Sequence, residues 1–100
     1  MFVHAVYFWG HPHLSDADKQ AWLKGLHTLP GIETVQHGYV GVPADTHRDV
    51  VENTYTYALV LLFRDKDGHD RYQAHLTHLT FVETCARYWA KVIVHDSIPA

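Results

Sequence analysis

The sequence contains a single cysteine, Cys85, and no long hydrophobic run. One cysteine cannot form a disulfide within the chain, which excludes a disulfide-stabilised scaffold. No stretch approaches the roughly 18–20 apolar residues that a membrane-spanning helix needs. The opening segment, MFVHAVYFWGHPH, lacks the basic start of a signal peptide. These absences predict a soluble protein with no membrane partner, and a cytoplasmic location is expected.

Basic residues are also few. Eight Lys and Arg stand against eleven Asp and Glu, which gives a net charge of −3 at pH 7. Nucleic-acid-binding domains carry a basic excess, so no nucleic-acid partner is expected. Hydrophobic residues make up 47% of the chain and aromatic residues 13%, which is enough for a core and excludes intrinsic disorder. A chain of 100 residues is expected to form one domain, residues 1–100.

Histidine is the residue in excess, with ten among 100 residues. Protonation of all ten would change the net charge from −3 to +7. The segment His11-Pro12-His13 and the pair His75 and His78 each offer two metal ligands, but no cysteine pair or HExxH motif completes a set. We therefore expect no dedicated metal site. Four other histidines are expected at the surface: His27, His37, His47 and His69.

The first third of the chain predicts a strand followed by a helix. β-Branched and aromatic residues at Phe2–Trp9 favour a strand. A helix is expected after Ser15, because Ser15 and Asp18 form a capping-box pair and apolar residues then recur at helical spacing through Leu29. Pro30-Gly31 ends this helix.

The rest of the chain predicts two strands, a helical region and a last strand. Ile32–Val42 is a weaker strand, in which Gly38 and Gly41 indicate a bulge or a close approach of two backbones. A polar loop, Pro43–Asn53, then leads to the strongest strand, Thr54–Phe63. The remaining elements are a helical segment that begins at Asp65–Gly68 and runs toward His75, a second one from His78 to about Tyr88, and a strand, Ala90–Ser97.

This order of elements is that of a ferredoxin-like βαββαβ protomer, an α+β fold with a four-stranded antiparallel sheet. Helices cover one face of such a sheet, so the other face should be polar. In Thr54–Phe63, however, both faces are apolar: Tyr55, Tyr57, Leu59, Leu61 and Phe63 alternate with Thr54, Thr56, Ala58, Val60 and Leu62. Phe2–Trp9 shows the same pattern. A large exposed apolar face marks an interface, so we expect a homodimer in which two sheets face one another.

Several segments match a known family pattern. They are the opening strand with its histidine (Phe2–Phe8), the helix end Leu29-Pro30-Gly31, the strand Tyr55–Leu59 and, most specifically, His69–His78 followed by Phe81-Val82. Over almost its whole length the chain resembles the stress-responsive dimeric α/β-barrel (Dabb) domain family. The family commonly has a proline where this chain has Leu76, which affects the local turn rather than the fold. The resemblance implies ferredoxin-like protomers that pair into a dimeric α/β barrel.

The resemblance also implies candidate site residues. A plant subset of the family resembles polyketide cyclases, which close a linear polyketide by an aldol step with a Tyr–His pair and a further histidine on the first strand. The matching positions are Tyr72, His78 and His4. Tyr72 and His78 are thus the candidate catalytic residues, and His4, Tyr72, His75 and His78 are the candidate ligand-binding residues.

Helical spacing leaves the arrangement of these residues open. Tyr72 and His75 lie three residues apart and share a helix face, whereas His78 would point elsewhere on a continuous helix. A break near Leu76-Thr77, with Thr77 as the cap of a new helix, would turn His78 inward.

His4 needs a hydrogen-bond partner, because it shares its strand face with Phe2, Val6 and Phe8. That partner is a ligand, Tyr72 or a backbone carbonyl.

Two classes of function stay open, and no cofactor is expected in either. The favoured one is a non-enzymatic homodimer that binds a small apolar ligand between sheet and helices. The alternative is a cofactor-independent polyketide cyclase- or isomerase-like enzyme, in which Tyr72 and His78 transfer a proton and His4 orients the substrate. A cofactor-independent monooxygenase-like enzyme is a second alternative from the fold alone. A purely structural Tyr72–His78 contact, which ties the helix to the sheet, competes with all three.

Overall fold

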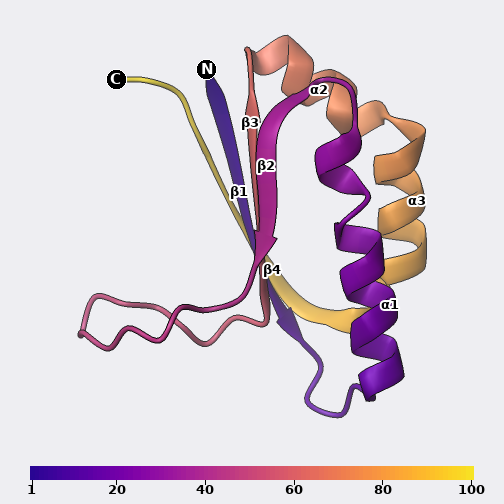
Figure 1. Ribbon diagram of the computed structural model, residues 1–100, viewed down its shortest axis with the longest axis vertical. Helices are drawn as coiled ribbons and strands as arrows, with labels where there is room; N and C mark the ends of the chain where they lie inside the picture. The colour runs from indigo at the N-terminus through magenta and orange to yellow at the C-terminus, as the bar shows by residue number, and fades with distance from the viewer.

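Four antiparallel strands form a sheet in the order β2-β3-β1-β4, and the helices pack against one of its faces (Figure 1). The computed structural model describes all 100 residues. In chain order the elements are β1 (Phe2–Gly10), α1 (Asp16–Leu26), η1 (Leu29–Gly31), β2 (Val35–Gly41), β3 (Tyr57–Phe63), α2 (Lys66–Ala74), α3 (Leu76–Cys85), η2 (Ala86–Tyr88) and β4 (Trp89–Ser97). The chain therefore has the ferredoxin-like βαββαβ fold predicted from its sequence, with the second helical region divided into α2 and α3. No helix is both long and apolar enough to cross a membrane.

Helix α1 begins with the predicted capping box. The Asp18 N–H donates to Ser15 Oγ at 3.0 Å, and the Ser15 N–H donates to the Asp18 carboxylate at 3.4 Å. The helix ends at Leu26, three residues earlier than predicted. Proline has no N–H, and its ring clashes with the carbonyl four residues before it, so Pro30 prevents the helix from running on through residue 30. The chain instead forms the short 3₁₀ turn η1.

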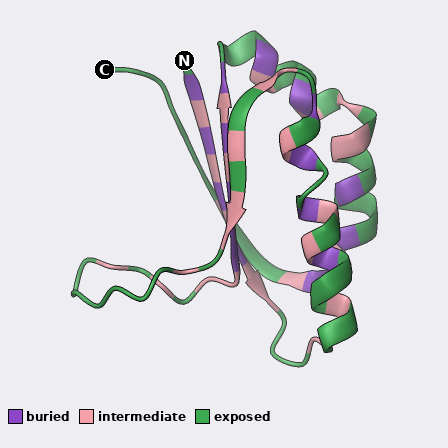
Figure 2. Ribbon diagram, in the orientation of Figure 1, coloured by how far each residue is buried: buried purple, intermediate pink, exposed green.

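A single core cluster of fifteen buried residues lies between the sheet and the helices (Figure 2). Trp22 is completely buried, and its ring centroid lies 4.9 Å from that of Tyr57 and 5.8 Å from that of Phe8. Aromatic side chains bury large apolar areas, and edge-to-face pairs of this kind add to that stabilisation. The helices are therefore held to the sheet mainly through aromatic contacts.

The other face of the sheet, here called the open face, has no helix over it (Figure 1). The predicted alternation is confirmed within the strands: residues of β1 and β3 that point to the helices are buried, and their neighbours on the open face are partly exposed, except Ala58, which is buried. Tyr55 is a second exception. It was grouped on one strand face with Tyr57 and Leu59, which lie on the helix side, but it precedes β3, so the alternation does not reach it. Its ring lies 5.0 Å from that of Tyr7 on the open face.

The loop between β2 and β3, residues 42–56, projects from the sheet on the open-face side (Figure 1). This is the region predicted as a polar loop, although β3 begins later than expected and the loop is correspondingly longer. Two of its apolar residues are strongly exposed, Val42 at 65% and Val50 at 81%. The loop therefore lies where it would border anything that covers the open face.

Strand β2 contains the predicted irregularity. Its pairing with β3 shifts register between Val35 and His37. A Cβ atom at Gly38 would lie 2.5 Å from Leu61 Cδ2 and 2.9 Å from the Val60 carbonyl oxygen. Gly38 is therefore required by a close backbone approach, as its position in the strand pattern suggested.

We expect Gly38→Ala to lower the free energy of unfolding by about 1–3 kcal/mol, because the added methyl group overpacks a site bounded by backbone. Gly31→Ala is the matched control, since a Cβ at Gly31 meets nothing within 4 Å. Urea denaturation measures both. Equal stabilities for the two variants would contradict the close approach at Gly38.

Candidate functional site

The break between α2 and α3 determines which histidine points toward the sheet. His75 lies between the helices in an extended conformation (φ −66°, ψ 141°). Its Nδ1 accepts the backbone N–H of Thr77 at 3.0 Å and so caps α3. The predicted break is thus present, but it occurs slightly earlier than expected, and the cap is His75 rather than Thr77. His78, in the first turn of α3, consequently lines a cleft beneath the helices.

Leu76 does not disturb this turn. It is the first residue of α3, a position where proline is favoured but not required. Its side chain is 75% exposed, so it displaces nothing in the core. The departure from the family pattern therefore leaves the local geometry intact.

A cleft of about 150 Å³ lies between the helix-facing side of the sheet and helices α2 and α3. It contains no aspartate, glutamate, lysine or arginine side chain; its polar residues are His4, Gln73 and His78, and Tyr72 adds a hydroxyl group. The other nine residues that line it are hydrophobic: Val6, Phe8, Leu29, Leu59, Tyr72, Phe81, Trp89, Val92 and Val94. Val92 and Val94 are 42% and 46% exposed, so the cleft opens along β4.

His78 presents a free nitrogen in this cleft. Its Nδ1 lies 3.0 Å from the carbonyl oxygen of Gln73, and a carbonyl can only accept, so Nδ1 carries the proton. In the neutral imidazole Nε2 is then an acceptor. Burial lowers the pKa of His78, and the bond to Gln73 opposes this only in part. His78 is therefore a neutral base at pH 7.

Tyr72 and His78 are in contact but not hydrogen-bonded to each other. Their ring centroids lie 4.8 Å apart with the planes inclined at 53°. Tyr72 is 1% exposed, and burial raises the pKa of its phenol, which keeps the hydroxyl protonated as a donor. The pair therefore offers one donor and one acceptor, and a hydroxyl group, which both donates and accepts, could use both.

His4 is buried on the central strand and has a partner that the sequence did not indicate. Its Nδ1–H donates to Asp96 Oδ1 at 2.6 Å. The two residues are directly paired across β1 and β4, so their side chains lie on the same face of the sheet. Burial lowers the pKa of His4, and Asp96 opposes this shift. The partners expected from the sequence, a ligand, Tyr72 or a backbone carbonyl, omitted this carboxylate.

His69 is not the surface residue that was predicted. Its side chain is only 12% exposed, and its ring stacks on Phe2 at 4.4 Å between centroids. The His4 ring lies 4.8 Å away. The sequence could have indicated that His69 is buried, because His69 precedes Tyr72 by three residues and so shares its helix face.

His75 does not line the cleft. Its Nδ1 is occupied by the cap of α3, and its Nε2–H lies 3.3 Å from the carboxylate of Glu33. Both nitrogens are thus engaged outside the cleft. Of the four candidate ligand-binding residues, the fold brings His4, Tyr72 and His78 together and leaves His75 in a capping position.

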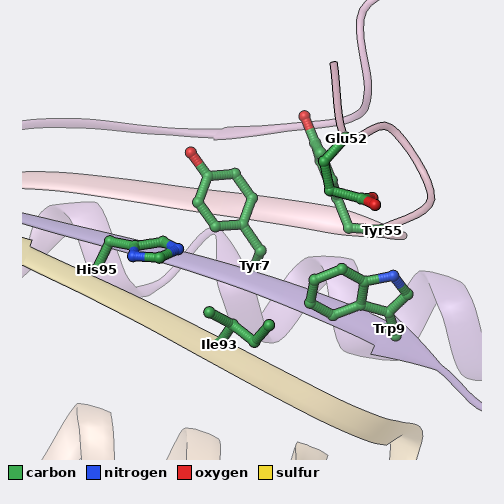
Figure 3. A pocket seen from close by; sticks show the side chains of 6 residues that line it. All are labelled: Tyr7, Trp9, Glu52, Tyr55, Ile93 and His95. Atoms are coloured by element: carbon green, nitrogen blue, oxygen red, sulfur yellow. The ribbon is translucent and has the colours of Figure 1, made fainter. Parts of the chain in front are cut away.

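A second, larger cavity of about 350 Å³ lies on the open face (Figure 3). Tyr7, Trp9, Glu52, Tyr55, Ile93 and His95 line it. The Trp9 indole N–H donates to Thr54 Oγ1 at 2.9 Å, which ties the loop before β3 to this face. This cavity is separated from His4 and His78 by the sheet, and it lies on the face expected to meet a second copy.

Comparison with known families gives one match over nearly the whole chain. The model of the Stress responsive A/B Barrel Domain (Dabb) family matches residues 2–99. No curated protein sequence matches the chain.

Solved structures share the fold at low sequence identity. The Arabidopsis thaliana protein At3g17210 is 23% identical with a TM-score of 0.81, covering 100% of this chain and 96% of its own. A dimeric ferredoxin-like protein of Thermobifida fusca is 18% identical with a TM-score of 0.78, covering 96% and 88%. A hydroxynitrile lyase from Passiflora edulis is 17% identical with a TM-score of 0.79, covering 99% and 93%. At these identities the likeness establishes the fold alone.

The lowered pKa of His78 predicts how stability depends on pH. In the unfolded chain His78 has the ordinary histidine pKa of 6.5, whereas its pKa in the folded protein is lower. Just below pH 6.5 the unfolded state is therefore protonated at His78 and the folded state is not. The free energy of unfolding therefore falls as the pH drops from 6.5 toward the folded pKa. Asn can keep the bond to the Gln73 carbonyl but does not titrate, so His78→Asn should flatten this dependence in urea denaturation between pH 7 and 5. Equal slopes for wild type and variant would contradict the burial of a neutral His78.

Proposed function

Because the chain belongs to the stress-responsive A/B barrel domain family, we propose that it works as a homodimer whose cleft between sheet and helices binds a small, neutral, largely apolar ligand. A cytoplasmic location remains a prediction from the sequence.

The uncharged lining of the cleft carries this proposal. Nine of its twelve residues are hydrophobic, and its polar groups are neutral side chains. Sites that bind phosphates or carboxylates present arginine, lysine or a row of backbone N–H groups. The cleft presents none of these side chains, so a neutral ligand suits it best.

The size of the cleft limits the ligand. Its volume of about 150 Å³ is smaller than the roughly 300 Å³ and more of typical drug-sized pockets. Apolar cavities near 150 Å³ take a benzene-sized molecule. A longer apolar chain could leave the cleft along β4, over Val92 and Val94. The ligand is therefore a benzene-sized group with or without an apolar tail.

The polar groups select one hydrogen-bonding function on that ligand. His78 and Tyr72 are neighbours on the wall of the cleft. Nε2 of His78 can accept a hydrogen bond from a ligand, and the Tyr72 hydroxyl can donate one. A hydroxyl group on the ligand can donate to the first and accept from the second. An alcohol or an enol matches this arrangement better than a hydrocarbon.

An enzymatic role is the alternative, and one observation favours it. His78 and His4 both donate through Nδ1, one to the Gln73 carbonyl and the other to Asp96, which leaves each Nε2 unprotonated. A neutral imidazole oriented in this way can act as a general base. Proton transfer of the cyclase or isomerase type would then use His78 as base, Tyr72 as donor and the His4–Asp96 pair to orient the substrate. The hydroxynitrile lyase of the same fold is an enzyme, although at 17% identity.

The monooxygenase alternative has only the fold in its favour. A monooxygenase-like protein from Nitrosomonas europaea shares this architecture at 16% identity and a TM-score of 0.74. Shared folds host unrelated chemistries. No side chain in the cleft favours oxygen chemistry over proton transfer.

The homodimer follows from the open face. Ala5, Tyr7, Val60 and Leu62 point away from the helices and stay partly exposed in a single chain. No helix covers this face of the sheet (Figure 1). Pairing two open faces would bury this apolar surface and the cavity of Figure 3, which stabilises association. The exposed valines of the β2–β3 loop project on the same side. The dimeric Thermobifida fusca protein has the same fold.

Benzyl alcohol and toluene test the cleft as a pair of probes that differ by one hydroxyl group. We expect saturable binding of benzyl alcohol, measured by NMR from the chemical-shift changes of the Leu59 and Val94 methyl groups, which line the cleft. His78→Asn should weaken it about tenfold, the equivalent of one hydrogen bond, without changing the binding of toluene. His75→Asn is the matched control, because Asn also caps helices well and His75 lies outside the cleft. No binding by the wild-type protein, or equal losses in both variants, would refute the proposal.

The same samples separate binding from catalysis. Exchange of the methyl protons of acetophenone in D₂O reports abstraction of a proton next to a carbonyl group. The binding proposal predicts exchange at the rate of buffer alone. Acceleration by the wild-type protein that His78→Asn abolishes would establish the enzymatic alternative instead.

The dimer is tested by placing a charge on the open face. Ala5 lies on the central strand, paired with Val60 and His95. Ala5→Asp would bring a carboxylate from each copy into an apolar interface, at a cost of several kcal/mol. Light scattering should therefore give a mass of 11.5 kDa for the variant and twice that for the wild-type protein. Ala17→Asp, on the exposed surface of α1, should remain dimeric. A monomeric wild-type protein at micromolar concentration would exclude the interface.

A further inference from the structure

Three potential metal ligands meet at the end of the sheet where β1 begins and β4 ends, beneath α2 (Figure 1). One nitrogen each from His4 and His69 and one carboxylate oxygen of Asp96 lie within 4.8 Å of one another. We propose that His4, His69 and Asp96 bind a divalent transition-metal ion such as Zn²⁺. This site shares His4 with the cleft but takes its other two ligands from outside it, and it does not depend on a ligand in the cleft.

The donor set is the first argument. Two imidazoles and one carboxylate form a combination that proteins use for Zn²⁺ and Fe²⁺, with the remaining positions open to water. Calcium and magnesium prefer oxygen donors only, so the two imidazoles argue against them. The set comes from three separate elements, which explains why no spacing in the sequence indicated it.

The surroundings of His69 are the second argument. Its Nδ1–H donates to the Asp70 carboxylate at 3.1 Å, and Lys66 holds that carboxylate in turn at 2.6 Å. Metal-binding histidines commonly donate their second N–H to a carboxylate, which fixes the ring and the tautomer. Nε2 of His69 is thereby left as the ligand nitrogen. Its present contact, the side-chain amide nitrogen of Gln73 at 3.3 Å, is long for a hydrogen bond and easily exchanged.

Little movement is needed to close the site. Donors around a tetrahedral zinc ion at 2.0–2.1 Å lie about 3.3 Å from one another. His4 Nδ1 and Asp96 Oδ1 are already 2.6 Å apart and share one proton. A metal ion would take the place of that proton on Nδ1, the neutral imidazole would then carry its proton on Nε2, and the ion would draw His69 inward. Asp96 is 38% exposed at an edge strand, so its side chain is free to adjust and the ion has a path from solvent.

Isothermal titration calorimetry with Zn²⁺, together with the visible absorption of Co²⁺, tests the site in the absence of any organic ligand. We expect the tightest site of the wild-type protein to be lost or weakened at least about tenfold in His69→Phe and in Asp96→Asn. Phe keeps the stacking on Phe2, and Asn at position 96 keeps a carbonyl oxygen that can accept from His4 Nδ1–H while it removes the carboxylate. Thermal unfolding of both variants verifies that they are folded. His47→Phe is the matched control, because His47 also lies 2.6 Å from a carboxylate, that of Asp45, but on the exposed loop.

Ten histidines offer other weak metal sites, so the test follows the tightest site only. Loss of the tightest site in both variants, with retention in His47→Phe, establishes the metal site. Retention of that site in either variant assigns the metal to other histidines and overturns the proposal. Absence of Zn²⁺ binding by the wild-type protein overturns it as well. Since benzyl alcohol is absent, failure here leaves the cleft proposal unaffected, and the reverse is also true.

Discussion

The buried imidazole of His4 is the constraint around which the site is organised. It lies on the central strand, 5% exposed, where a polar group without a partner would cost about 1–3 kcal/mol. Asp96 meets this requirement from the adjacent strand, 92 residues away in the chain. The bond fixes which nitrogen of His4 is protonated and holds the end of an edge strand to the middle of the sheet. Stability and the chemistry of the site thus depend on the same contact.

The break at His75 has a comparable effect on the helical side. A continuous helix would direct His78 away from the face shared by Tyr72, but the extended backbone at His75 restarts the helix and brings His78 beside the Tyr72 ring. His75 contributes to this arrangement by capping rather than by contacting a ligand. A polar side chain at this turn therefore shapes the cleft without lining it.

The sequence predicts the elements of the fold well, because alternation and capping are local properties. The capping box of α1 and the inward residues of β1 are as expected. Asp96 could not be assigned to His4, since the register between strands at opposite ends of the chain is set by tertiary packing. Tyr55 was placed on the wrong face because the start of β3 was predicted too early. His69 was misplaced for a different reason: its helical spacing from Tyr72 indicated burial, whereas histidine composition alone favoured the surface.

The account rests on the claim that both cleft histidines are neutral and carry their proton on Nδ1, so that Nε2 is free. Two-bond ¹⁵N–¹H correlation spectra of imidazole-labelled protein distinguish the two tautomers and the imidazolium directly. The bonds from His78 to the Gln73 carbonyl and from His4 to Asp96 predict the Nδ1–H pattern for both residues at pH 7. An Nε2–H tautomer or an imidazolium at His78 would contradict the account, because His78 would then present no acceptor nitrogen to a ligand in the cleft.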